Sequence, residues 1–497
     1  MGAVAENATL IATLTRELTA AELASLAPQI DVLEVRADYM GDLRPEVLRE
    51  RCGRRLLYTL RSVVEGGAGE SAPEPRRARL LAAAEAGYDL IDLEAERDLD
   101  SQLLERIAPK RRILSWHGAP SDTASLARHF SEMAGTPAWL YKLVPAAAHH
   151  GEELAPLALL GELERRDVLA FASGPIGAWT RLIAPRLGAP VVYGAASEVP
   201  GASGQPSMDS LIRDYGLPRL APFERCFGLI GNPVSHSLSP RLHNGAYRAL
   251  GIPALYLPFH VESFADFWLE VVESELLPAL GVHLVAFSVT SPHKAAALAV
   301  AEGISPLAER IGAANTLLLG PEGWLAESTD PAGLLGPLAE RGIELVDREV
   351  AVVGAGGAGR SVVAGLVEAG ARVSLVNRSG GRGRQAAVEL GVDFVPLEHF
   401  VPGAFEIVVN ATAVGRDPAG PLPFAVDDLA PCALVVDLVY GQQPTPLVVA
   451  ARARGLMAID GREVLLFQGQ EQFRRMTGRV LPTELGRRLL GLTEESR

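Results

Sequence analysis

The stretch that decides the fold is Val350-Ala351-Val352-Val353, followed directly by Gly354-Ala355-Gly356-Gly357-Ala358-Gly359. The apolar run predicts a buried strand, and the glycines predict a tight turn that opens a helix. Glycines let the backbone approach a pyrophosphate, and the free N–H groups of a helix N-terminus bind its charge. The stretch therefore predicts a Rossmann unit whose cofactor contacts are the six residues of the turn.

The residues after the next predicted strand indicate which dinucleotide is bound. An NAD site places Asp or Glu about 20 residues after the glycines, where the carboxylate binds the ribose 2′-hydroxyl. Here that position holds Asn377-Arg378-Ser379, and Arg382 follows. A carboxylate would repel a 2′-phosphate, whereas an arginine holds one with two parallel hydrogen bonds. The sequence therefore predicts an enzyme that uses NADP(H).

Composition limits the number of domains, the kinds of partner and the cellular compartment that can be expected. The chain of 497 residues is long enough for several domains, since a domain averages about 150 residues. Its net charge of −14 disfavours nucleic acid and anionic membranes as partners. The cysteines Cys52, Cys226 and Cys432 lie far apart, which favours a reducing compartment and offers no metal-binding spacing. We therefore expect a cytoplasmic enzyme with small-molecule substrates, no metal and no membrane span. The oligomeric state stays open.

Before this Rossmann unit, short apolar runs alternate with amphipathic stretches over the first 200 residues, which is typical of βα units. Strands are predicted at residues 8–14, 30–36, 55–61, 88–94, 111–116, 138–144, 167–172 and 190–194. Eight βα units in fewer than about 250 residues predict a closed (β/α)8 barrel, whose catalytic groups lie at the carboxyl ends of the strands. Polar residues occur there: Glu34, Arg36, Arg61, Glu94, His117 and Lys142.

Lys142 ends an apolar strand, and for a single lysine a solvated surface group would be the simpler interpretation. Apolar walls and nearby cations disfavour its ammonium form, so that the neutral amine can attack a carbonyl and form an imine. The imine acidifies the adjacent carbon, and His117, one strand earlier, is placed to remove that proton. Glu65 is expected to orient the imidazole. An anionic substrate is indicated by three arginines: Arg36, Arg61 and Arg181.

Residues 217–222 contain two prolines and are expected to be a linker. After this linker, apolar runs again alternate with amphipathic stretches, and strands are predicted near 226–231, 254–259, 283–289 and 314–319. We expect three domains, assigned as a barrel over 1–217, a substrate-binding α/β domain over 225–330 and a Rossmann NADP-binding domain over 331–463. The helical tail over 464–492 is expected to fold back onto the substrate-binding domain.

Polar loops of this second part contain a candidate acid–base pair. Lys294 and Asp330 each follow a predicted strand. A carboxylate keeps a nearby lysine charged and aimed, and the lysine can donate a proton to an oxygen that gains negative charge. Ser239 precedes Pro240 and predicts a helix N-cap, which does not exclude a substrate role for its hydroxyl.

The first part of the chain resembles the type I 3-dehydroquinate dehydratases. The matching pieces are Leu33-Glu34-Val35-Arg36-Ala37-Asp38, Thr59-Leu60-Arg61, Glu65-Gly66-Gly67, Ser115-Trp116-His117, Tyr141-Lys142, Ser173-Gly174-Pro175-Ile176-Gly177 with Arg181, and Gly204-Gln205. The resemblance implies that Lys142 forms the imine, His117 moves the proton and Glu65 supports His117 during syn elimination of water from 3-dehydroquinate. The implied substrate contacts are Glu34, Arg36, Arg61, Arg181 and Gln205.

One loop departs from that family. The family usually carries Ser-Ala-Pro-Gly-Gln, whereas this chain has Gly201-Ala202-Ser203-Gly204-Gln205. The serine is displaced by two positions, and the sequence leaves open whether Ser203 replaces it. An inert barrel that serves as a scaffold or interaction module is the alternative interpretation.

Residues from about 228 to 473 resemble shikimate dehydrogenase, with modest departures at Ser288, Pro331 and Ser379. The resemblance implies that Lys294 and Asp330 are the catalytic pair. The implied shikimate contacts are Ser237, Ser239, Thr290, Asn315, Tyr440 and Gln468. The implied cofactor contacts beyond the glycine turn are Asn377, Arg378, Ser379, Arg382, Asn410 and Thr412.

The two implied reactions are consecutive. The barrel would produce 3-dehydroshikimate, which is the ketone that the second half would reduce to shikimate with NADPH. The sequence therefore predicts a bifunctional enzyme of the shikimate pathway, a lyase and an oxidoreductase in one chain. Transfer of the intermediate between the two sites and side activity on quinate stay open.

Overall fold

The computed structural model describes residues 7–417 and 419–492. By its internal contacts the chain divides into two compact units, which are described separately below. One unit contains Met1–Arg225 and Leu257–Leu284, and the other contains Cys226–Tyr256 and Val285–Arg497.

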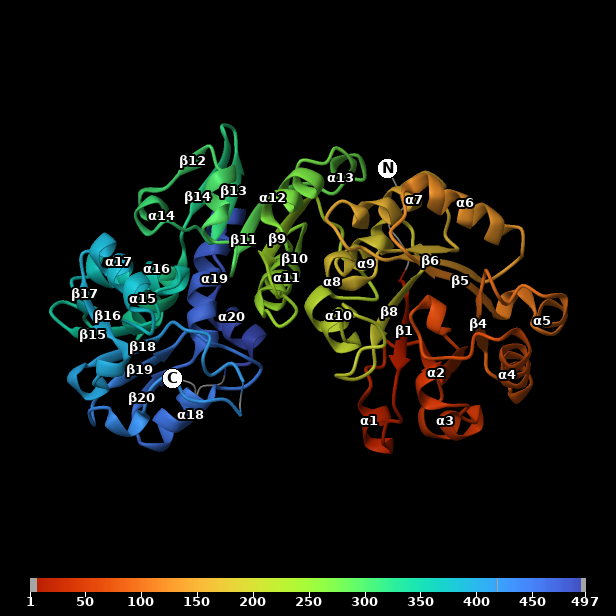
Figure 1. The fold of residues 1–497 in the computed structure, drawn as a ribbon, viewed down its shortest axis with the longest axis horizontal. Coiled ribbons are helices and arrows are strands. Elements are labelled where there is room, and N and C mark those ends of the chain that lie inside the picture. The colour runs from red at the N-terminus through yellow and green to blue at the C-terminus, as the bar shows by residue number, and fades with distance from the viewer. Residues whose placement is uncertain (1–6, 418, 493–497) are drawn as a thin grey trace. The chain divides into compact units, whose positions relative to one another are not determined.

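The strands predicted in the first 200 residues form one parallel eight-stranded sheet in the order β7-β6-β5-β4-β3-β2-β1-β8 (Figure 1). They are β1 (Thr9–Leu14), β2 (Val32–Arg36), β3 (Arg55–Thr59), β4 (Leu90–Glu94), β5 (Arg112–Gly118), β6 (Leu140–Pro145), β7 (Val168–Ala170) and β8 (Val191–Ala195). Among the described residues, strands β7 and β8 are not hydrogen-bonded to each other. The barrel is therefore nearly closed, whereas the sequence predicted a closed one.

Helices follow the barrel strands, as expected for βα units. They are α1 (Ala20–Ser25), α2 (Ala37–Met40), α3 (Pro45–Cys52), α4 (Pro73–Ala86), α5 (Ser101–Arg106), α6 (Thr123–Ala134), α7 (Ala155–Leu163), α8 (Gly174–Gly177), α9 (Thr180–Ile183) and α10 (Met208–Tyr215). A short 3-10 turn, η1 (Val63–Glu65), follows β3 and brings Glu65 to the carboxyl end of the barrel.

The second sheet is mixed and has the order β10-β9-β11-β13-β14-β12. Its strands are β9 (Arg225–Gly231), β10 (Ala254–His260), β11 (Leu284–Val289), β12 (Gly303–Ile304), β13 (Thr316–Gly320) and β14 (Gly323–Glu327). The sequence analysis missed β12 and β14, because β12 has two residues and β14 follows β13 through a tight hairpin. The accompanying helices are α11 (Ser239–Leu250), α12 (Phe264–Phe267), α13 (Leu276–Ala279) and α14 (Pro306–Ile311).

The third sheet is parallel and has the order β17-β16-β15-β18-β19-β20. Its strands are β15 (Glu349–Val353), β16 (Arg372–Asn377), β17 (Asp393–Pro396), β18 (Ile407–Asn410), β19 (Leu434–Asp437) and β20 (Met457–Ile459). This is the doubly wound order of a Rossmann fold, in which a dinucleotide binds where the strand order reverses, between β15 and β18.

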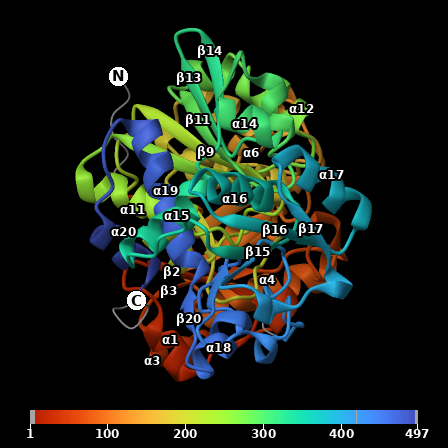
Figure 2. The ribbon, with the colours of Figure 1, turned by 90° about the vertical axis from the view of Figure 1, so that its left-hand side faces the viewer.

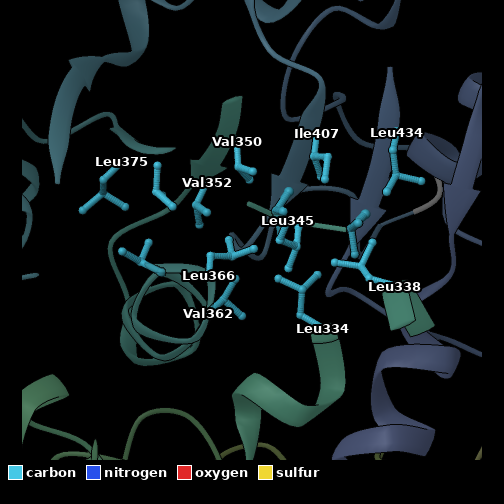
Figure 3. Close-up of a cluster of buried hydrophobic side chains, with 14 of the residues drawn as sticks. Leu334, Leu338, Leu345, Val350, Val352, Val362, Leu366, Leu375, Ile407 and Leu434 are labelled. Carbon is cyan, nitrogen blue, oxygen red and sulfur yellow. The ribbon is translucent and has the colours of Figure 1, made fainter. Parts of the chain in front are cut away.

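Helices α15 (Asp330–Glu340) and α16 (Gly357–Glu368) pack on the third sheet. Figure 3 shows their side chains, among them Leu334 and Leu366, meeting the strand residues Val350, Val352 and Ile407 in one buried cluster. Apolar packing of this kind holds the helix that begins at the glycine turn firmly against the sheet. Helices α17 (Gly380–Leu390) and α18 (Pro446–Ala453) complete the layers.

The last described helices are α19 (Gly461–Thr477) and α20 (Thr483–Leu490), which lie beside α11 and α15 (Figure 2). Leu466 and Phe473 of α19 share a buried cluster with Phe227, Leu242 and Tyr247. The end of the chain therefore contributes to the core around β9. Within the described ranges, no helix is long and apolar enough to cross a membrane.

Candidate active sites

Lys142 lies on β6 inside the barrel, where its side chain is buried. Its Nζ atom lies 4.2 Å from the centroid of the Tyr193 ring. Burial lowers the pKa of Lys142, and the positive charges of Arg61 and Arg36 lower it further, against the opposing carboxylates of Asp92 and Glu34. The environment therefore favours the neutral amine that nucleophilic attack requires.

His117 on β5 contacts Glu65 in η1, as the sequence predicted. The imidazole Nδ1 atom lies 3.1 Å from Glu65 Oε2, which also accepts the backbone N–H of His117 at 3.2 Å. Burial and the neighbouring cations hold the pKa of His117 well below its ordinary value. The histidine is thus neutral, and a Glu65 carboxylate that accepts from Nδ1–H leaves Nε2 free to act as a base.

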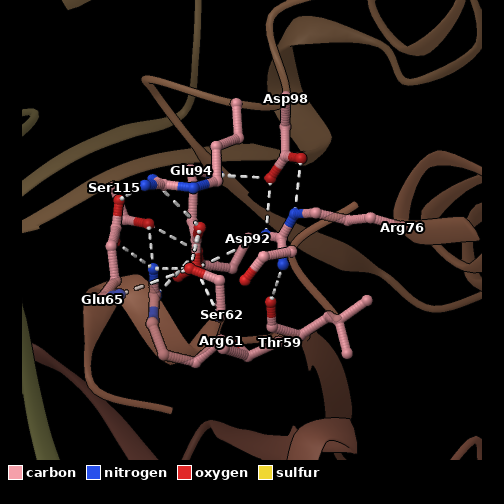
Figure 4. A network of polar contacts seen from close by, with 12 residues as sticks. Thr59, Arg61, Ser62, Glu65, Arg76, Asp92, Glu94, Asp98 and Ser115 are labelled. Carbon is pink, nitrogen blue, oxygen red and sulfur yellow. Dashed lines mark hydrogen bonds and ion pairs between the residues drawn. The ribbon is translucent and has the colours of Figure 1, made fainter. Parts of the chain in front are cut away.

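Arg61 is bound by three carboxylates (Figure 4). Its guanidinium donates to Glu65 at 2.8 Å, Asp92 at 2.9 Å and Glu94 at 3.3 Å. It also donates to Ser115 at 3.0 Å. Burial alone would lower the pKa of Arg61, but these carboxylates outweigh it and raise the pKa. The sequence analysis missed Asp92, although an aspartate inside the apolar strand Leu90–Glu94 was a signal that could have found it.

Arg36 and Arg181 differ in how far their charge is already neutralised. Arg36 makes a bidentate pair with Asp38, at 2.8 and 2.6 Å. Arg181 on α9 is buried over the ring of Phe171, and its Nε atom has no hydrogen-bond partner. No carboxylate of the described residues pairs with Arg181, and burial lowers its pKa to about 10. A buried guanidinium with an unused N–H group is suited to an anionic substrate.

Glu34 and Gln205 share a hydrogen-bond partner. Glu34 accepts from the hydroxyls of Thr13 at 2.7 Å and Thr59 at 2.8 Å. Gln205 donates to Thr13 Oγ1 at 3.0 Å and accepts the N–H of Gly201 at 2.7 Å. The structure therefore brings the first strand and the last loop of the barrel together at the predicted substrate residues.

In the second unit, Lys294 Nζ donates to Asp330 Oδ2 at 2.5 Å. The other carboxylate oxygen of Asp330 accepts from Asn315 Nδ2 at 2.7 Å. Asn315 is fixed in turn, because its Oδ1 atom accepts the backbone N–H of Thr329 at 2.8 Å. The structure thus assembles the predicted pair and one predicted substrate residue into a single rigid group.

Gln472 on α19 was missed by the sequence analysis. This buried side chain accepts from Ser288 Oγ at 3.0 Å and donates to the backbone oxygen of Asn315 at 3.0 Å. It therefore links the end of β11, which carries Ser288, to the segment that carries Asn315. A helix from the end of the chain cannot be assigned to this contact from local sequence, since the two residues are 157 positions apart.

The serine loop differs from its prediction in one detail. Helix α11 begins at Ser239, its N-cap is Leu238, and Ser237 Oγ accepts the N–H of Ser239 at 3.2 Å. The predicted N-cap role of Ser239 is therefore wrong, because Ser239 is the first residue of the helix and its N-cap, Leu238, has no side-chain acceptor. Ser237 Oγ also lies 3.4 Å from the hydroxyl of Tyr440. Burial raises the pKa of Tyr440.

The two remaining predicted substrate residues of the second unit are Thr290 and Gln468. Thr290 directly follows β11 and donates its backbone N–H to Ile230 at 2.8 Å. Gln468 lies on α19, half-buried, with its Cβ 3.0 Å from the position that a Cβ on Gly333 would take. The structure records no direct hydrogen bond between these two described side chains and the Lys294 group.

The glycine turn has the shape that a dinucleotide requires. Gly354 has φ +118°, and a Cβ on Gly359 would lie 1.9 Å from the oxygen of Gly354. Gly356 is the N-cap of α16, and a Cβ there would meet no atom within 4 Å. A Cβ on Gly357 would lie 3.3 Å from Lys294 Cδ, so the turn and Lys294 are neighbours. Open space before a helix N-terminus fits a pyrophosphate.

The residues directly after β16 are exposed and include two arginines. Asn377 Oδ1 accepts the N–H of Ala355 at 3.3 Å, which ties the end of β16 to the turn. Arg378, Ser379 and Arg382 are exposed beside it. Arginines accessible at the ribose position, with no acidic residue in the 377–382 segment, fit NADP(H).

Asn410 ends β18, and Thr412 lies in the loop that follows. Asn410 is fully buried, donates to Asp437 Oδ1 at 2.9 Å and accepts from Thr412 Oγ1 at 2.7 Å. The side-chain amide of Asn410 is therefore hydrogen-bonded to other residues of the protein. Burial raises the pKa of Asp437 to about 6. These contacts shape the loop that faces Gly354, whose Cβ position lies 2.9 Å from the Ala411 backbone.

Comparisons with known proteins agree with this geometry. Residues 8–219 match the type I 3-dehydroquinase family, and residues 229–317 match the shikimate dehydrogenase substrate binding domain. The shikimate dehydrogenase (NADP(+)) of Citrifermentans bemidjiense is 42% identical over 273 residues, covering 51% of this chain and 90% of that protein. The chain belongs to the shikimate dehydrogenase family.

Two further relatives match, one over about half of the chain and one over most of it. The shikimate dehydrogenase (NADP(+)) of Halorubrum lacusprofundi is 39% identical over 277 residues, covering 52% of this chain and 95% of that protein. The chloroplastic bifunctional 3-dehydroquinate dehydratase/shikimate dehydrogenase of Arabidopsis thaliana is 29% identical over 490 residues, covering 92% of this chain and 79% of that protein. A bifunctional shikimate-pathway enzyme, with a 3-dehydroquinate dehydratase joined to an NADP-dependent shikimate dehydrogenase, is thereby confirmed.

Proposed function

We propose that Lys142 is the nucleophile of the dehydratase and that Lys294 with Asp330 is the acid–base pair of the reductase. We further propose the domain division predicted above, a barrel over 1–217, a substrate-binding domain over 225–330 completed by 464–492, and a cofactor domain over 331–463. Cytoplasmic localisation stays a prediction from composition.

In the barrel, the neutral amine of Lys142 attacks the ketone carbon of 3-dehydroquinate, and loss of water gives an imine. His117 removes a proton from the adjacent carbon, and the same residue can return it to the departing hydroxyl, which leaves as water. Hydrolysis of the imine releases 3-dehydroshikimate and regenerates the lysine. Glu65 holds His117 in the tautomer that this sequence of steps requires.

Arg181 is the residue that we propose to bind the substrate carboxylate. Its buried guanidinium has an unused Nε–H group, whereas Arg36 and Arg61 are already paired with carboxylates of the protein. An incoming carboxylate would therefore neutralise Arg181 without displacing an existing ion pair. Arg61 stays paired with Glu65 and Asp92, and Arg36 with Asp38. The charges of both arginines then contribute to the electrostatic potential around Lys142.

In the reductase, the N–H groups of the glycine turn would hold the pyrophosphate, and Arg378 with Arg382 would hold the 2′-phosphate. NADPH supplies the hydride when it is bound. Lys294, kept charged by Asp330, donates a proton to the ketone oxygen as that oxygen gains negative charge. Ser237, Ser239, Thr290, Tyr440 and Gln468 supply the polar groups for the shikimate hydroxyls and carboxylate, and Asn410 with Thr412 supports the cofactor loop.

The burial of Lys142, close enough to the His117–Glu65 pair for its charge to lower the pKa of His117, is the observation that carries this proposal. Borohydride reduces an imine to a stable amine, so protein treated with 3-dehydroquinate and borohydride should gain the mass of the substrate on Lys142. The matched control is Lys142→Ala, which should gain no mass. A parent chain that stays unmodified and does not dehydrate 3-dehydroquinate would favour the scaffold interpretation of the barrel.

A further inference from the structure

Thr13 is a buried residue near the end of β1 that the proposed chemistry leaves unused. Its strand pairs with β2 on one side, where Thr13 is opposite Glu34, and with β8 on the other, where it is opposite Ala195. Its side chain is 2% exposed. Thr13 therefore lies between the strand that carries a predicted substrate residue and the strand that leads into the 201–205 loop.

The hydroxyl of Thr13 connects two predicted substrate residues. It donates to Glu34 Oε2 at 2.7 Å and accepts from Gln205 Nε2 at 3.0 Å. A hydroxyl has one donor and can accept, so both capacities are used in defined directions. The Gln205 amide is oriented at its other end, where it accepts the N–H of Gly201 at 2.7 Å. One hydroxyl thus fixes both the carboxylate and the amide.

The methyl group of Thr13 occupies the space beside Gly201. A Cβ built on Gly201 would lie 2.6 Å from Thr13 Cγ2, far inside van der Waals contact. It would also lie 3.1 Å from Gln205 Oε1 and 3.4 Å from Arg36 Nη1. Arg36 donates to the Gly201 oxygen at 2.8 Å, which holds the loop in this place. The obstacle to a side chain at this position is steric.

Ser203 does not fill the place beside Thr13, because its side chain is exposed. The serine that the dehydratase family carries at the Gly201 position therefore has no substitute from its own loop.

We infer that Thr13 is a positioning residue of the dehydratase site, and that Thr13 and Gly201 form a steric pair that replaces a loop serine. The inference rests on the proposed dehydration at Lys142. The hydroxyl of Thr13 holds Glu34 and Gln205 against the substrate, and its methyl group requires glycine at position 201. A serine can occupy position 201 in this loop conformation when residue 13 is smaller.

The steric half is tested by a double-mutant cycle of Gly201→Ser and Thr13→Ser. Gly201→Ser should lower kcat/KM for 3-dehydroquinate by about tenfold, because the added Cβ displaces the loop. The variant with both substitutions should recover most of that loss, although Thr13→Ser alone lowers kcat/KM modestly. Equal losses from Gly201→Ser in the two backgrounds would overturn the steric pair.

The hydroxyl is tested by Thr13→Val, which keeps the shape of threonine and leaves Glu34 and Gln205 without their shared partner. KM for 3-dehydroquinate should rise by about tenfold with a smaller change in kcat, because the substrate contacts lose their positions while Lys142 and His117 stay in place. Thr13→Ser should keep KM close to that of the parent. A Thr13→Val variant with parental KM would overturn the positioning role.

Hydrogen exchange of the 197–206 peptides in the full chain separates these outcomes from a failure of the proposed function. Gly201→Ser should speed exchange of the loop, and Thr13→Ser in the same chain should slow it again. This readout needs no catalysis, so it tests the pair even if the parent barrel does not dehydrate 3-dehydroquinate. Unchanged exchange in Gly201→Ser would overturn the pair.

Discussion

At the scale of single residues, burial sets the proton affinities on which dehydration depends. It lowers the pKa of Lys142 and of His117, and it raises the pKa of Glu65 to about 8 against the opposing charge of Arg61. Neutral amine and neutral imidazole are the forms that the proposed chemistry uses. Glu65 is the exception, since its ionised form is needed to hold the imidazole Nδ1–H.

The raised pKa of Glu65 predicts a pH dependence. Below about pH 8 the folded protein increasingly holds a proton on Glu65, and above it the carboxylate accepts from His117. We therefore expect kcat/KM for dehydration to rise with pH through neutrality and level off above about pH 8. Glu65→Gln should lower the rate and remove this rise. The pH profiles of both proteins check the prediction, and an unchanged profile in Glu65→Gln would contradict it.

Arg378 should decide the choice of coenzyme. Arg378→Ala removes a charge-assisted contact with the 2′-phosphate, so KM for NADPH should rise by about tenfold or more while KM for NADH changes little. Arg384→Ala is the matched control, because Arg384 lies on α17, which begins directly after the 377–379 segment, and its guanidinium packs over the Phe394 ring. Steady-state kinetics with both coenzymes measure the effect. Equal changes for the two coenzymes would contradict the assignment.

At the scale of elements, helix α15 shows how a departure from the family is accommodated. Pro331 falls in the first turn of α15, where the missing N–H group costs no helical hydrogen bond. A Cβ on Gly365 of α16 would lie 2.7 Å from Pro331 Cβ, so a glycine on the neighbouring helix makes room for the ring. Asp330, the first residue of α15, therefore keeps its contact with Lys294.

The two ends of the glycine turn should respond differently to alanine. Gly359→Ala forces a Cβ to within 1.9 Å of the Gly354 oxygen, so it should destabilise the protein by about 1–3 kcal/mol and lower the thermal midpoint. Gly356→Ala enters open space, so it should keep the midpoint and weaken NADPH binding. Thermal unfolding and NADPH titration of both variants check this contrast. Equal midpoints for the two variants would contradict it.

At the scale of the whole molecule, each half carries its own chemical groups. Lys142, His117 and Glu65 belong to the barrel, and Lys294 and Asp330 belong to the other unit.

The two lysines should therefore be separable by mutation. Lys142→Ala should abolish dehydration of 3-dehydroquinate and leave the oxidation of shikimate with NADP intact. Lys294→Ala should lower kcat for shikimate by at least about a hundredfold, the usual size of an acid–base contribution, and leave dehydration intact. Parallel absorbance assays on each variant measure both reactions. Loss of both activities in either variant would contradict the division.

Much of the fold was predictable because hydrophobic periodicity is local. The barrel strands were placed to within a few residues, and the glycine turn identified the Rossmann sheet before any contact was known. The short strand β12 and the hairpin strand β14 were missed, since they are held by pairing with neighbours more than by their own apolar pattern. Ser239 was assigned as the N-cap of α11, whereas the helix begins at Ser239 itself and its N-cap is Leu238, since helix ends are placed from sequence only to within a residue or two.

The sequence by itself determined which reactive groups this protein carries and where they stand along the chain, since a lysine after an apolar run and an arginine after a glycine turn are visible in local sequence. The tertiary structure alone decided which arginine charges are available to bind a substrate. Arg36 and Arg61 are paired with Asp38 and Asp92, while Arg181 has no carboxylate partner in the part of the chain that the structure describes. It also brought Thr13 against Gly201. Pairing and steric fit depend on distances between residues far apart in the chain, which only folding sets.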